Sequence, residues 1–76
     1  MFQAEVESLM ESLESHEHAD IIKGSIRHCV TYGDVNGIAY NLCILKGVPA
    51  HNTVVPGPLI TEFVDEFQRL YPITVH

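Results

Sequence analysis

Residues 26–46 read IRHCVTYGDVNGIAYNLCILK, and this stretch is compatible with two helices or with two strands. As helices, the segments 20–32 and 34–46 each gather apolar side chains on one side. Asp34 then stands at a helix N-cap, where a carboxylate accepts from a backbone N–H. Gly47 stands just past the last apolar residue, where glycine commonly ends a helix.

As strands, residues 26–32 and 38–45 are rich in β-branched and aromatic residues, and the five residues between them suit a hairpin loop. Gly24 and Gly37 disfavour the helical interpretation at about 1 kcal/mol each. The 38–45 segment disfavours the hairpin, because both of its faces would be largely apolar. We predict helices for both segments.

The flanking segments give stronger helical patterns. Residues 2–16 place apolar side chains at spacings of three and four, with carboxylates on the opposite side. Residues 58–71 begin with Pro58, which is favoured in the first turn of a helix, and stop before Pro72. Their apolar side chains form one broad face (Leu59, Ile60, Phe63, Val64, Phe67, Leu70 and Tyr71).

The expected fold is therefore an all-α, small four-helix domain with helices at about 2–16, 20–32, 34–46 and 58–71. The alternative is an α+β fold with a 26–32/38–45 hairpin between two helices. Residues 48–57 are expected to form a loop stiffened by two prolines. A short strand pair between residues 53–55 and 73–75 is a further possibility. We also expect Asp20 to cap the second helix.

Length and composition favour one small domain, residues 1–76, with an apolar share of 46%. So much apolar surface in so short a chain favours a homodimer that shares its core. Two cysteines are too few for a secreted disulfide scaffold. The acidic N-terminal segment lacks the features of a signal peptide, so we expect a cytoplasmic protein.

The net charge of −6 is concentrated in the first twenty residues, which contain no Lys or Arg. Six carboxylates lie there (Glu5, Glu7, Glu11, Glu14, Glu17 and Asp20), whereas the remaining charges balance. The net charge disfavours nucleic acid and anionic membranes as partners. The segment is either a solvated helix face or a surface that attracts a basic partner protein.

We predict a small acidic protein–protein interaction module, such as an adaptor, inhibitor or regulatory subunit, that binds a basic surface. Carboxylates on the first helix would attract the partner, while the 48–57 loop and tyrosines placed off the core faces (Tyr32, Tyr40) would add apolar contact. The predicted partner-binding residues are Glu7, Glu11, Glu14, Tyr40, His51, Val54 and Val55. A nucleic-acid-mimicking inhibitor is a further alternative.

A second alternative is a metal-binding regulatory protein that uses the segment His16–Asp20. His16, His18 and Asp20 have side chains that coordinate zinc, nickel or copper. Within a helix, His16 and His18 would point to different sides. A structural site needs four ligands, so His28, His51 or His76 would have to converge on them.

Catalysis is not expected, and neither is a cofactor. Cys29 follows His28, but adjacent residues on one element point in different directions and make a poor nucleophile–base pair. Cys29 and Cys43 both occupy apolar positions, where buried, unreactive thiols are usual.

Overall fold

Within residues 1–72, which the computed structural model describes, the chain forms four α-helices and one short turn of 3-10 helix. They are α1 (Gln3–Ser15), α2 (Ala19–Tyr32), α3 (Val35–Lys46), the 3-10 turn η1 (Ala50–Asn52) and α4 (Gly57–Leu70). The prediction of a small all-α four-helix domain is confirmed.

The hairpin alternative is wrong, because residues 26–32 lie in α2 and residues 38–45 lie in α3. Residues 53–55 form a loop, and residues 73–75 lie outside the described residues. Over residues 1–72, no helix combines the length and apolar character needed to span a bilayer.

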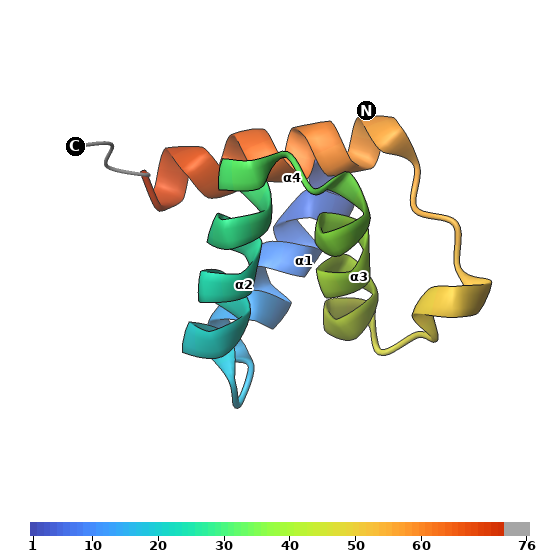
Figure 1. Ribbon diagram of the computed structural model, residues 1–76, viewed down its shortest axis with the longest axis horizontal. Helices are drawn as coiled ribbons and strands as arrows, with labels where there is room; N and C mark the ends of the chain where they lie inside the picture. The colour runs from blue at the N-terminus through green and yellow to red at the C-terminus, as the bar shows by residue number, and fades with distance from the viewer. Residues whose placement is uncertain (73–76) are drawn as a thin grey trace.

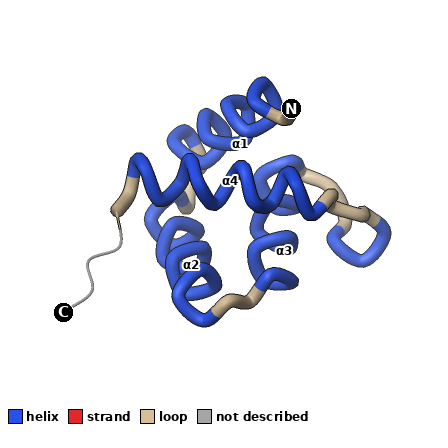
Figure 2. Tube along the Cα trace, turned by 90° about the horizontal axis from the view of Figure 1, so that it is seen from above, coloured by secondary structure: helices blue, strands red, loops and turns tan. Residues whose placement is uncertain are grey.

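Helices α1, α2 and α3 pack together, and α4 crosses one end of the three. In Figure 1, α2 and α3 stand side by side in front, α1 lies behind them, and α4 runs across one end of all three. Figure 2, seen from above, shows α4 crossing between α1 and the α2–α3 pair. This crossing position lets one face of α4 contact several helices, which accounts for the broad apolar face in its sequence.

The core lies where the apolar faces of the four helices meet. Buried side chains of α1 and α4 recur at spacings of three and four, as the sequence predicts. Phe63 and Phe67 are fully buried, and their rings stack with centroids 6.2 Å apart. The other core residues are Val6, Leu9, Met10, Leu13, Ile22, Ile26, Cys29, Ile38, Leu42, Leu45, Leu59 and Ile60.

Residues at the helix ends explain why α2 and α3 are separate helices. Gly33 and Gly47 adopt the left-handed conformation, with φ of 67° and 71°, and end α2 and α3. Asp34 Oδ1 accepts from the Gly37 N–H at 2.9 Å, so the predicted cap of α3 is confirmed. The predicted cap at Asp20 is wrong: α2 begins at Ala19, and Asp20 lies in its first turn.

Asp34→Ala should lower the free energy of unfolding by about 1 kcal/mol, because the Gly37 N–H loses its acceptor at the start of α3. Asp20→Ala is the matched control, since it removes a carboxylate that makes no capping hydrogen bond. Chemical denaturation of both variants measures the difference. Equal losses would contradict the capping role of Asp34.

The α2–α3 seam is the line along which these two helices touch, and Gly37 lies on it, against Cys29. A Cβ atom at Gly37 would lie 2.6 Å from Cys29 Sγ, so only glycine fits there without a shift. One turn further along α3, the buried Asn41 Nδ2 donates to Ser25 Oγ at 3.1 Å and to the Gly37 carbonyl at 2.9 Å. Gly37 therefore allows close packing of α2 on α3.

Candidate functional site: an acidic groove between α1 and α4

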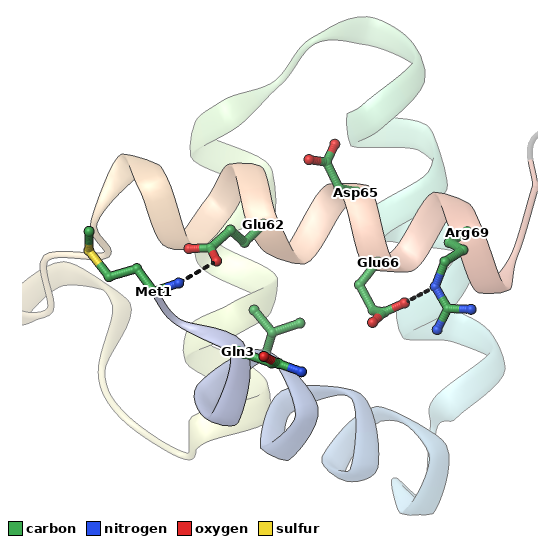
Figure 3. Close-up of a pocket in the computed structure, with 7 residues that line it drawn as sticks. Met1, Gln3, Glu62, Asp65, Glu66 and Arg69 are labelled. Atoms are coloured by element: carbon green, nitrogen blue, oxygen red, sulfur yellow. Dashed lines mark hydrogen bonds and ion pairs between the residues drawn. The ribbon is translucent and has the colours of Figure 1, made fainter.

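Two adjoining hollows, of about 370 and 680 Å³, run between α1 and α4 and together form what we call the α1–α4 groove. Both are lined by Glu66 and Arg69 of α4. Figure 3 shows the first hollow, with Glu62, Asp65 and Glu66 on α4 above the start of α1. The second continues along α1 past Glu7, Glu11 and Glu14.

The groove is strongly acidic, because both helices contribute carboxylates to it. Six carboxylates line it, against two cations, the Arg69 guanidinium and the Met1 ammonium. The six carboxylates are Glu7, Glu11 and Glu14 from α1 and Glu62, Asp65 and Glu66 from α4. Like charges held close together repel, so this arrangement favours the approach of positive charge.

Half of these carboxylates are engaged in ion pairs. Glu66 pairs with Arg69, Glu14 lies 3.7 Å from Lys23 Nζ of α2, and Glu62 lies 3.2 Å from the Met1 ammonium. Within residues 1–72, the other three (Glu7, Glu11 and Asp65) form no ion pair. These three carboxylates are free to meet a partner's cations.

Apolar atoms lie between the two rows of carboxylates. Met10 is buried on the α1 side, and Leu70 is 44% exposed at the end of α4. The groove therefore combines acidic edges with an exposed apolar side chain, Leu70, at one end. Such a surface suits a ligand that carries apolar and basic side chains on the same face.

Glu62 also joins the two helices at one end of the groove. Its two carboxylate oxygens each accept from the Phe2 N–H at 3.2 Å. The N-cap residue of α1, Phe2, offers no side-chain cap of its own, so α4 supplies the acceptor. This contact holds the start of α1 against α4.

Sequence reasoning identified Glu7, Glu11 and Glu14 but missed Glu62, Asp65 and Glu66 as members of the same surface. The signal in the sequence is their spacing, which places these acids on the outer side of the α4 helix. The spacing does not show which helix lies beside this side of α4. The structure shows that α4 packs on α1.

Three of the four other predicted partner-binding residues line a separate hollow, of about 690 Å³, between α3 and the 48–56 loop. Tyr40, His51 and Val55 line it together. Val54 does not line it and is 91% exposed. This hollow shares no lining residue with the α1–α4 groove, so the structure divides the predicted residues between two surfaces.

Of the candidate metal ligands, His16 and His18 lie between α1 and α2, and Asp20 lies in the first turn of α2. The His18 N–H donates to His16 Nδ1 at 2.9 Å, which occupies one of the two nitrogens of that imidazole. Among residues 1–72, no three His, Cys, Asp or Glu side chains are close enough to hold a metal ion. His76 lies outside the described residues.

The two cysteines are both buried and unpaired by disulfide. Cys29 lies at the α2–α3 seam, against Gly37. His28 is exposed on the other side of α2, where its ring centroid lies 4.6 Å from that of Tyr32. The thiol and the imidazole therefore do not come together.

Apart from Val54, the predicted partner-binding residues line the α1–α4 groove or the hollow beside α3, and the groove concentrates the charge. Comparison of the chain with protein-family models, curated proteins and solved structures finds no match.

Proposed function

We propose that this protein binds a basic segment of another protein in the α1–α4 groove, and acts as an adaptor, inhibitor or regulatory subunit without catalysis. One observation supports the proposal above others: two helices bring six carboxylates together in one groove, beside the exposed side chain of Leu70. Only one guanidinium lines the same groove.

The spacing of the carboxylates favours a helical ligand. Glu7, Glu11 and Glu14 follow one another at intervals of four and three, so they form a row along one side of α1. Lysine or arginine at the same intervals on a partner helix would meet that row, and an apolar side chain between them would reach Leu70. Charge attraction of this kind speeds association and selects basic partners.

We also propose that the protein works in the cytoplasm. Two thiols without a disulfide among the described residues support this compartment, since disulfides persist mainly in oxidising ones.

A synthetic amphipathic helix of Leu and Lys, labelled with a fluorophore, tests the groove directly by anisotropy. Glu7→Gln/Glu11→Gln should weaken binding about tenfold at low ionic strength, because it removes two carboxylates that form no ion pair within residues 1–72. Glu17→Gln/Asp20→Asn is the matched control: it changes the net charge equally but leaves the groove intact.

The salt dependence gives a second measurement. Binding by the wild type should weaken as ionic strength rises, and the dependence should be shallower for the groove variant than for the control. Equal effects of the two double variants would show that the peptide responds to net charge alone, and the groove proposal would be wrong.

A further inference from the structure

Arg69 holds a position in the α1–α4 groove that no other Lys or Arg among residues 1–72 shares, because it lines the groove and they do not. It lines both hollows, and Glu66 is the one other residue of the described chain common to the two. Arg69 therefore lies where the two hollows meet. A guanidinium at this point repels the positive charge that the surrounding carboxylates attract.

The Arg69 guanidinium has hydrogen-bond donors to spare. A guanidinium carries five N–H donors, and here Nε donates to Glu66, as the dashed line in Figure 3 shows. Within residues 1–72, the two terminal nitrogens form no hydrogen bond. The side chain is 69% exposed, so a ligand can reach these nitrogens. A carboxylate fits them best, since it accepts two parallel hydrogen bonds from one guanidinium.

The ion pair with Glu66 leaves this contact open. It joins side chains three residues apart on the surface of α4, and exposed pairs of this kind contribute little to stability. Arg69 can therefore keep Glu66 through Nε or release it at little cost when a second carboxylate arrives.

The carboxylates that form no ion pair within residues 1–72 lie on both sides of this point. Asp65 lines the first hollow, whereas Glu7 and Glu11 line the second. An elongated ligand in the groove meets negative charge at each end and the Arg69 guanidinium between the ends. The complementary ligand is basic at both ends and acidic in the middle.

We propose that the partner segment carries an acidic side chain that pairs with Arg69, between basic side chains that pair with the groove carboxylates; this rests on the function proposed above. Arg69 then determines specificity within the groove. It stabilises a segment of mixed charge and repels one whose charges are all positive, and repulsion of this kind is a common way to exclude wrong partners.

Two labelled helical peptides of identical composition test this charge pattern by anisotropy. About two helical turns separate Gln3, in the first hollow, from Glu11, in the second. Both peptides therefore carry two lysines about two turns apart on a Leu-containing side. In the first peptide a Glu lies midway between these lysines, and in its isomer this Glu is exchanged with a Gln on the opposite side of the helix. The two isomers have the same net charge.

The wild type should bind the first peptide about fivefold more tightly than its isomer at low ionic strength. Arg69→Gln should remove this preference, and Arg69→Lys should retain part of it, because the charge stays while the planar fork is lost. Arg27→Gln is the matched control: it changes the net charge equally at an exposed position of α2 that lines neither hollow. It should keep the full preference.

A peptide that carries Lys in place of the central Glu gives the opposite result. Arg69→Gln should bind it about fivefold more tightly than the wild type does, since the repulsion is gone, and Arg27→Gln should leave its affinity nearly unchanged. Circular dichroism checks that each variant is folded, as expected at exposed positions.

The outcomes separate the role of Arg69 from the function of the groove. Equal affinities of the wild type for the two isomers, or a preference that persists in Arg69→Gln, would overturn the role of Arg69. If Glu7→Gln/Glu11→Gln still weakened both isomers, the groove would remain the binding site. If that variant weakened neither isomer, the proposed function would be wrong, and the charge pattern with it.

Discussion

Phe67→Ala should lower the free energy of unfolding by about 3–5 kcal/mol, the typical cost of removing a buried phenylalanine ring. Phe67 is fully buried on α4, between the ring of Phe63 and that of Tyr71, whose centroid is 5.1 Å away. The Tyr71 ring in turn lies 4.6 Å from Lys23 Nζ. The substitution therefore leaves a cavity where α4 packs over the other helices.

This loss is a large share of the total free energy of unfolding, because the whole domain is small. Stability of about 0.05–0.15 kcal/mol per residue amounts to roughly 4–11 kcal/mol for a chain of this length. We expect the melting temperature of Phe67→Ala to fall by at least about 12 °C, with a substantial unfolded population at 25 °C. Thermal and chemical denaturation followed by circular dichroism measure both.

Two control variants separate the cavity from other effects. Phe67→Leu keeps most of the apolar volume and should cost less than half as much as Phe67→Ala. Leu70→Ala removes a side chain of the same helix that is 44% exposed, and it should have a small effect. If Leu70→Ala destabilised the protein as much as Phe67→Ala, the assignment of α4 as the central core helix would be wrong.

Local signals in the sequence predicted the ends of the four α-helices to within one residue. The spacing of Val6, Leu9 and Leu13 predicts the buried side of α1, and Asp34 and Gly47 mark the ends of α3. These features act over one or two turns, so a short window of sequence contains them. The error at Asp20 arose because a carboxylate suits the first turn of a helix as well as its cap.

The candidate site was less predictable because it depends on which helices touch. Periodicity shows that Glu7 and Glu66 lie on outer sides of their helices, but it does not show that α1 and α4 are neighbours. Tyr32 and Tyr40 were expected to lie off the core faces, and both are exposed, but only the structure shows that Tyr40 lines a hollow with His51 and Val55.

Gly24→Ala and Gly37→Ala should change stability in opposite directions, although both glycines lie inside helices. Gly24 has no neighbour within 4 Å of an added Cβ, so alanine should stabilise α2 by about 0.5–1 kcal/mol. At Gly37 the same Cβ would lie 2.6 Å from Cys29 Sγ and from Asp34 Oδ2. Overpacking of the seam and disturbance of the Asp34 cap should outweigh the gain in helix propensity, for a net loss of about 2 kcal/mol.

A double-mutant cycle with Cys29→Ala locates the cause of the loss at Gly37. Cys29→Ala removes the sulfur that the new methyl group would meet, so Gly37→Ala should cost about 1 kcal/mol less in that background. The Asp34 contact remains in both backgrounds and should account for the rest. Stabilisation by Gly37→Ala, or a zero coupling energy with Cys29, would contradict close packing of α2 on α3. Close packing at Gly37 offsets the propensity cost of this glycine, whereas at Gly24 no atom of residues 1–72 lies within 4 Å of an added Cβ to compensate for that cost.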